Sequence, residues 1–143
     1  MQLYFEAPPL LAVNQPEQAV VWERPETGGL VALKTGTQAQ PVLGSKGDDH
    51  RIDWGFLYLG APSGKQVTSR IASGPEVRGQ FADSGALSGA DDEQQPRPAS
   101  QDEPVLAVAF DLRQLSGPVE RHVLLAYDEE WAVTFFGRRL RPS

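Results

Sequence analysis

The chain has 143 residues, with 13 Lys and Arg against 19 Asp and Glu, a formal net charge of −6 and no Cys. The absence of Cys excludes disulfides, thiolate nucleophiles and Cys-ligated metal centres. The negative charge argues against nucleic acid and anionic lipid as partners, because both attract basic surfaces. No apolar run approaches the ~20 residues that cross a bilayer, and the Met1 end has no signal-peptide pattern. This length predicts one domain, residues 1–143, with a core of its own.

Gly and Pro, 14 and 12 in number, are spread along the whole chain and leave little room for long helices. Between them lie short runs rich in β-branched and aromatic residues. These predicted strands are residues 3–7, 19–23, 30–35, 51–61, 66–72, 105–112, 119–127 and 131–136. The pattern predicts an all-β protein, an antiparallel β-sandwich with long acidic loops and at most one short helix.

Two of the predicted strands alternate clearly between inward and outward positions. In the first, the residues expected to face the core are Ile52, Trp54, Phe56 and Tyr58. In the second, they are Leu106, Val108, Phe110 and Leu112. One face of each strand is therefore expected to be buried.

Two local structures are predicted from turn and breaker residues. The run ending at Tyr127 is followed by Asp128, Glu129 and Glu130 and then by residues 131–136, which predicts a hairpin with an acidic tip. A short helix is predicted over residues 76–82, with Pro75 in its first turn and Gly85 ending it.

Polar segments separate these elements. Residues 83–104 are rich in Ser, Gly, Gln, Pro and acid and predict a flexible acidic loop. A second polar connection covers residues 36–49. Apolar residues lie close to both ends of the chain, so we expect a domain truncated at both ends that lacks a neighbour.

The clearest cluster of titratable residues surrounds His50. Asp48, Asp49 and Asp53 lie within six residues of one another, and such a set could ligate a divalent cation. The spacing fits no defined metal loop, so we expect an exposed turn, no metal and no cofactor. For His122, in the run 119–127, we expect a hydrogen-bonded position on a sheet face.

Acid–base pairs between Asp53 and the acidic residues 128–130 are conceivable, and hydrolysis of a glycosidic bond would require two such carboxylates about 5 to 10 Å apart. Charged hairpin tips are common, however, and favour a solubilising role for residues 128–130. Asp53 lies between Ile52 and Trp54, so it needs a partner if it is buried. We favour a buried carboxylate that pins a loop over a catalytic one.

Three further features have a structural and a functional interpretation. Trp22, Trp54 and Trp131 could stack on sugars if exposed in a row, but their strand settings favour the core. Residues 60–65 superficially resemble a phosphate loop but lack its full spacing and predict a hairpin turn. The basic residues 138, 139 and 141 could meet acids on a neighbouring domain.

Three separated strings resemble one known family. Residues 47–59 read Gly-Asp-Asp-His-Arg-Ile-Asp-Trp-Gly-Phe-Leu-Tyr-Leu, similar to the signature of the N-terminal β domain of the glutaminase A family, with Phe56 where that family has Tyr. Residues 127–137 resemble the family's Tyr-Asp-Asp segment that ends in Tyr-Phe-Gly, and residues 2–5 resemble its Gln-Leu-Tyr strand. The family pattern continues into Pro-Tyr-Trp, where this sequence reads Arg141-Pro142-Ser143.

The resemblance implies a β-sandwich that precedes a larger helical domain in secreted or surface enzymes that hydrolyse L-glutamine to glutamate and ammonia. It implies a possible structural or cleft role for seven motif positions, which are Asp48, Asp49, Asp53, Trp54, Gly55, Tyr127 and Asp128. It transfers no catalytic residue.

We therefore expect a non-catalytic accessory domain, inactive alone, whose partner is the helical catalytic domain of an extracellular parent protein. The alternatives are a free-standing carbohydrate-binding module and a hydrolase that uses Asp53 with residues 128–130.

Overall fold

The computed structural model describes residues 1–44, 51 and 53–141. Its elements are β1 (Gln2–Ala7), the 3₁₀ helix η1 (Pro9–Ala12), β2 (Ala19–Glu23), β3 (Leu30–Thr37), β4 (Phe56–Pro62), β5 (Val67–Ser73), α1 (Gly74–Ser84), β6 (Arg97–Pro98), β7 (Pro104–Asp111), β8 (Leu124–Asp128), β9 (Val133–Phe135) and β10 (Arg138–Leu140). The all-β prediction is therefore confirmed.

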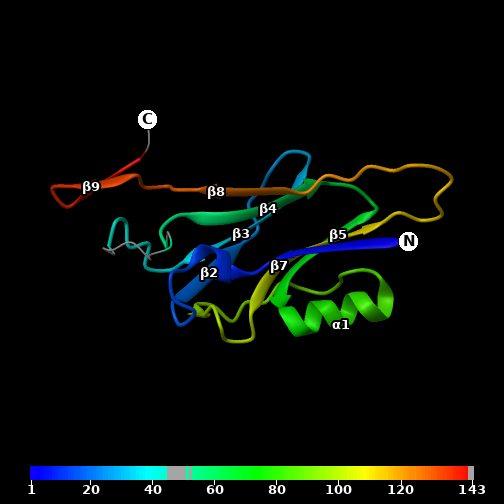
Figure 1. Ribbon diagram of the computed structural model, residues 1–143, viewed down its shortest axis with the longest axis horizontal. Helices are drawn as coiled ribbons and strands as arrows, with labels where there is room; N and C mark the ends of the chain where they lie inside the picture. Colours follow the sequence, from blue (N-terminus) through cyan, green and yellow to red (C-terminus); the bar gives the residue numbers. More distant parts are fainter. Residues whose placement is uncertain (45–50, 52, 142–143) are drawn as a thin grey trace.

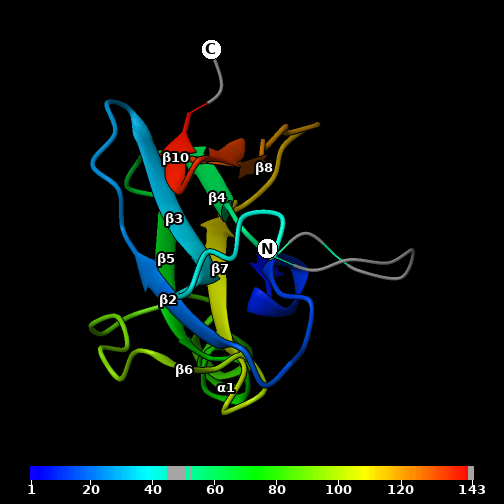
Figure 2. The same ribbon diagram turned by 90° about the vertical axis from the view of Figure 1, so that its left-hand side faces the viewer.

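Two antiparallel sheets form a sandwich (Figures 1 and 2). One has the strand order β1-β7-β5 and the other β6-β2-β3-β4-β8, while β9 and β10 pair only with each other. The main core lies between the sheets, where Leu33 and Leu59 meet Ile71, Leu106 and Val108. Burial of these apolar side chains is the main stabilising contribution to such a fold.

Strand β7 is buried on both faces, because α1 covers the outer side of its sheet. Leu106 and Val108 face the main core as predicted, whereas Val105 and Ala107 join a second cluster with Val77 of α1. A nearly continuous apolar run, rather than strict alternation, is typical of a strand covered on both sides, and β7 has such a run.

The predicted helix is confirmed and is longer by two residues at each end. Pro75 lies in the first turn of α1, where its missing N–H is not needed. Gly85 ends the helix in the left-handed conformation with φ 71°, and its N–H donates to the carbonyl of Phe81 over 2.8 Å. Among the described residues, no helix is long and apolar enough to cross a membrane.

The predicted core face of β4 is wrong. Phe56 and Tyr58 lie half-buried on the outer face, and Leu57, Leu59 and Ala61 are the buried residues. The strand also begins only at Phe56, so Trp54 precedes it, and Ile52 lies outside the described residues. Apolar residues occupy both phases of β4, so alternation alone could not select the inner face.

The predicted hairpin with an acidic tip is also wrong. Strand β8 pairs with β4, with Phe56 opposite Asp128, and β9 pairs instead with β10. The turn between β9 and β10 has positive φ at Phe136 and Gly137 (47° and 75°), the geometry of a tight two-residue hairpin. Because β8 begins at Leu124, His122 precedes the strand and is exposed, contrary to the prediction.

A flexible acidic loop was predicted over residues 83–104. The segment between α1 and β7, residues 85–103, instead forms hydrogen bonds and an ion pair with the sandwich. The indole N–H of Trp22 donates to the Asp92 carbonyl over 2.6 Å, and the buried Arg97 forms an ion pair with Asp92 at 2.7 Å. Arg97 also belongs to β6, which pairs with β2. The segment therefore covers the edge of the larger sheet.

Candidate functional site

The residues of the family-like motifs meet where the chain enters β4. Asp53, Trp54 and Gly55 lead into this strand, and Tyr127 and Asp128 end the neighbouring β8. Asp48 and Asp49, together with His50, lie outside the described residues. We call the five described residues the β4 junction.

Asp53 is a buried carboxylate with 2% exposure. Its Oδ2 accepts a hydrogen bond from Gln18 Nε2 over 2.7 Å, and its backbone carbonyl accepts one from the Thr37 hydroxyl over 2.6 Å. The Gln18 Oε1 in turn accepts from the backbone N–H groups of Asn14 and Gln15. Asp53 thus connects the loop before β2 to the end of β3.

Both Asp53 and Trp54 keep one buried polar atom without a hydrogen-bond partner in the part of the chain described. These atoms are Asp53 Oδ1 and Trp54 Nε1. Substrate cannot reach a carboxylate covered this completely, so its present geometry does not suit acid–base catalysis.

Gly55 is held by the side-chain amide of Gln40. Gln40 Nε2 donates to the Gly55 carbonyl over 3.0 Å, and Gln40 Oε1 accepts from the Gly55 N–H over 2.5 Å. Gly55 has φ +97°, and a Cβ there would lie 2.7 Å from the Asp128 carbonyl oxygen and 3.0 Å from Tyr127 Cε1. Only glycine fits this approach of β4 to β8.

Tyr127 closes the junction from β8. Its hydroxyl donates to the Trp54 carbonyl over 2.7 Å. Burial, together with the negative charges of Glu129 and Asp53, raises the pKa of Tyr127 to about 12. The phenol therefore stays protonated near neutral pH and serves as a hydrogen-bond donor.

Glu130, one of the acidic residues after β8, forms an ion pair with Lys34. The Lys34 Nζ lies 3.0 Å from Glu130 Oε1, 2.9 Å from Glu23 Oε1 and 3.8 Å from the centre of the Phe56 ring. Burial lowers the Lys34 pKa, but the hydrogen bonds to Glu23 and Glu130 outweigh that effect and raise it. The Glu130 carboxylate is thus paired with a largely covered ammonium group of the same domain.

The three indoles do not form an exposed row. Trp22 is buried, with the Arg97 guanidinium 5.0 Å from its ring centre. Trp54 and Trp131 are partly buried, and the Arg141 guanidinium lies 5.3 Å from the Trp131 ring centre. Of the three basic residues near the end of the chain, Arg141 therefore contacts Trp131 within the domain.

Within the described ranges, no three His, Asp or Glu side chains gather closely enough to hold a metal ion. Three polar residues that bind the β4 junction were not singled out from the sequence, namely Gln18, Thr37 and Gln40. Each acts through contacts with residues 15 to 35 positions away in the chain, and no local pattern marks such a role.

The comparison with known proteins concerns the whole chain and not the β4 junction alone. A family model described as a domain of unknown function, DUF5127, matches residues 1–143. No curated protein and no solved structure matches the chain. The match covers the full sequence, and the chain therefore belongs to the DUF5127 family.

Proposed function

We propose that this chain is a non-catalytic accessory domain of a glutaminase A-like hydrolase, and that it packs against a helical catalytic domain of the same polypeptide. The parent protein would hydrolyse L-glutamine to L-glutamate and ammonia and would act outside the cell. Both statements rest on the resemblance of residues 47–59, 127–137 and 2–5 to the glutaminase A family.

The observation that carries the packing proposal is an open side of the sandwich. We define the open side by Leu3 and Phe5 of β1 and Leu125 and Tyr127 of β8. β1 and β8 are edge strands of the two sheets, and both lie toward the same side of the molecule (Figure 2).

The register places these four side chains on the inner faces of their sheets. Phe5 lies opposite Val108, and Leu125 lies opposite the buried Leu59. Nevertheless Leu125 is 50% exposed and Phe5 39% exposed. Large apolar side chains left exposed on the inner faces of two edge strands are consistent with a surface that a further domain covers.

The β4 junction supports the non-catalytic part of the proposal, because its motif residues have structural contacts. Its motif residues are engaged in fixing the ends of β3, β4 and β8, and the Asp53 carboxylate is covered. Residues used in this way favour a scaffold over an active site within this domain.

The carbohydrate-binding alternative lacks comparable support. That alternative rested on an exposed row of the three indoles, and here Trp22 is covered while Trp131 contacts Arg141. Binding of oligosaccharides by the isolated chain would contradict the accessory-domain proposal.

The first test is enzymatic and genetic. We expect the purified chain to release no ammonia from L-glutamine, and we expect the encoding DNA to continue in frame into a helical domain. Turnover by the chain alone, or stop codons on both sides, would overturn the proposal.

The second test addresses the open side. In the parent protein expressed as two pieces, Leu125→Asp should weaken association of this chain with the helical domain by about tenfold or more, because it places a charge in an apolar contact. The matched control is Leu30→Asp, which changes a similarly exposed Leu (41%) on β3, away from the open side. Equal effects of the two substitutions would show that the open side is not the interface.

A further inference from the structure

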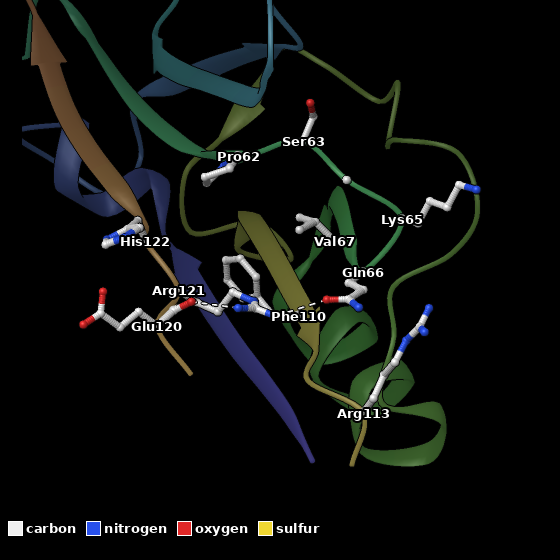
Figure 3. A pocket seen from close by; sticks show the side chains of 11 residues that line it. Pro62, Ser63, Lys65, Gln66, Val67, Phe110, Arg113, Glu120, Arg121 and His122 are labelled. Atoms are coloured by element: carbon white, nitrogen blue, oxygen red, sulfur yellow. Dashed lines mark hydrogen bonds between the residues drawn. The ribbon is translucent and has the colours of Figure 1, made fainter. Parts of the chain in front are cut away.

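A second site lies at the end of the sandwich where β4 passes into β5. The sequence predicted a hairpin turn there, but β4 and β5 belong to different sheets, so the turn crosses from one sheet to the other. Together with residues 120–122, which precede β8, this turn borders an open pocket of about 490 Å³ (Figure 3).

The floor of the pocket is apolar. Val67 and Phe110 are register partners on β5 and β7, and Pro62 ends β4 on the other side of the space. Phe110 belongs to the main core and is only 2% exposed, so Pro62 and Val67 supply most of the apolar surface that is open to a ligand. A ligand with a compact apolar group could bury that group here.

The rim of the pocket is positively charged. Lys65, Arg113 and Arg121 line it together with His122, against the single acid Glu120. Figure 3 shows the Glu120 carboxylate and the Lys65 ammonium pointing outward, while Arg121 lies across the floor beside Phe110. This concentration of cations is notable in a chain with a formal net charge of −6, because it creates a local field that attracts anions.

Arg121 is oriented but not neutralised. Its Nη2 donates to Gln66 Oε1 over 3.1 Å, and its Nη1 donates to the Glu120 backbone carbonyl over 2.7 Å. A guanidinium has five N–H donors, so these two bonds fix it in place and leave others available. No carboxylate of the described residues forms an ion pair with Arg121, Arg113 or Lys65.

We propose that this pocket binds a small organic carboxylate that carries a compact apolar group. The carboxylate pairs with Arg121, and the apolar group packs on Pro62 and Val67. An oriented guanidinium beside a hydrophobic floor selects for both parts of such a ligand, because charge-assisted bidentate pairing and apolar burial are satisfied together. This binding activity goes beyond the accessory role and does not depend on it.

The test uses the 143-residue chain and phenylacetate as the probe. Titration followed by two-dimensional NMR should show saturable shifts of the backbone amides of Gln66, Val67, Arg121 and His122. Two matched compounds separate the contributions: phenylacetamide lacks the charge and acetate lacks the ring, and each should bind at least about tenfold more weakly. Equal binding of either compound, or shifts located elsewhere, would overturn the proposal.

A pair of variants tests the role assigned to the guanidinium. Arg121→Gln should weaken phenylacetate binding by about tenfold or more, since it removes a charged donor. Arg138→Gln, an exposed Arg of β10 that does not line the pocket, should leave the affinity unchanged. Unchanged binding in a folded Arg121→Gln protein contradicts the proposal, and the NMR map of the unaltered chain decides the question if that variant does not fold.

Discussion

At the scale of single residues, the β4 junction depends on groups whose neighbours come from distant parts of the chain. Because Gly55 has no Cβ, the Asp128 carbonyl can lie close to it. Gln40 forms hydrogen bonds with both backbone polar groups of Gly55. The Tyr127 hydroxyl donates to the Trp54 carbonyl. Buried polar groups satisfied in this way fix one arrangement of the strand ends.

Gly55→Ala should lower the free energy of unfolding by at least about 2 kcal/mol, because a Cβ at φ +97° both strains the backbone and collides with β8. Urea denaturation followed by circular dichroism measures the change. The matched control is Gly64→Ala, since Gly64 has no atom within 4 Å of a Cβ position. Similar losses in both variants would show that β4 and β8 do not approach as described.

Tyr127→Phe should change the pH dependence of stability. The pKa of Tyr127 is raised from 10.0 to about 12, so the folded state favours the neutral phenol. That contribution is complete below pH 10 and is lost as the pH rises through about 12. The free energy of unfolding should therefore fall less steeply between pH 10 and 12 in the variant than in the unaltered chain.

The slope in Tyr127→Phe should not vanish, because burial also raises the pKa of Tyr4 and Tyr58. Near pH 7 the variant should lose about 1 kcal/mol, the usual contribution of one hydrogen bond. Identical pH profiles for the two proteins would contradict the assigned environment of Tyr127.

At the scale of elements, the edge of β2 is completed by a side chain. β6 pairs with Ala19 and Val20, and beyond it Gln95 continues the pairing with Trp22. Gln95 Oε1 accepts from the Trp22 N–H over 2.7 Å, and Nε2 donates to the Trp22 carbonyl over 2.9 Å. The amide group thus replaces a strand neighbour at the edge of the larger sheet.

Gln95→Ala should lower the free energy of unfolding by about 1–2 kcal/mol, because it leaves two backbone groups of the buried Trp22 unpaired. Thermal or urea unfolding provides the measurement. Gln94→Ala changes the adjacent exposed Gln and should alter stability by less than about 0.5 kcal/mol. Equal costs at both positions would show that the Gln95 amide does not support β2.

At the scale of the whole molecule, apolar surface gathers at one end as well as on the open side. The β9–β10 hairpin projects beyond the two sheets (Figure 1). Phe135 and Phe136 are 61% and 90% exposed, with their ring centres 4.5 Å apart. A contiguous pair of this kind binds apolar molecules more readily than an isolated exposed residue does.

Phe136→Asn should reduce the fluorescence of a hydrophobic dye added to the chain while leaving stability unchanged or slightly higher. Asn tolerates the positive φ of 47° better than Phe, and it removes half of the exposed pair. Leu43→Asn is the matched control, because Leu43 is also exposed and has φ 52°. A larger effect of Leu43→Asn would contradict the importance of the hairpin surface.

Turn residues, helix-terminating residues and alternation along single strands predict only part of the fold, because they carry no information on which strands pair. The helix was predictable because Pro75 and Gly85 act within their own turns. The core face of β7 was predictable because Leu106, Val108 and Phe110 recur at every second position. The all-β class followed from the short apolar runs between Gly and Pro, and composition excluded Cys chemistry.

The sequence also named five of the residues that meet at the β4 junction, through family resemblance and not through their contacts. For Asp53 the apolar setting also predicted a buried carboxylate that pins a loop, and its 2% exposure confirms the burial. Gln18, Thr37 and Gln40, which hold the junction together, carried no local signal. The inner face of β4 was ambiguous because its neighbouring positions Phe56 and Leu57 are both apolar.

Only the tertiary structure decided that β8 pairs with β4 rather than β9, that Gln18 and Thr37 are the partners of Asp53 and that a basic rim surrounds an apolar floor below the β4–β5 turn. Period and turn residues act over a few positions, whereas strand pairing in a sandwich joins segments such as β4 and β8, separated by about 70 residues. Which of the possible pairings is adopted depends on the free energy of burying all the strands together, and that quantity belongs to no single segment.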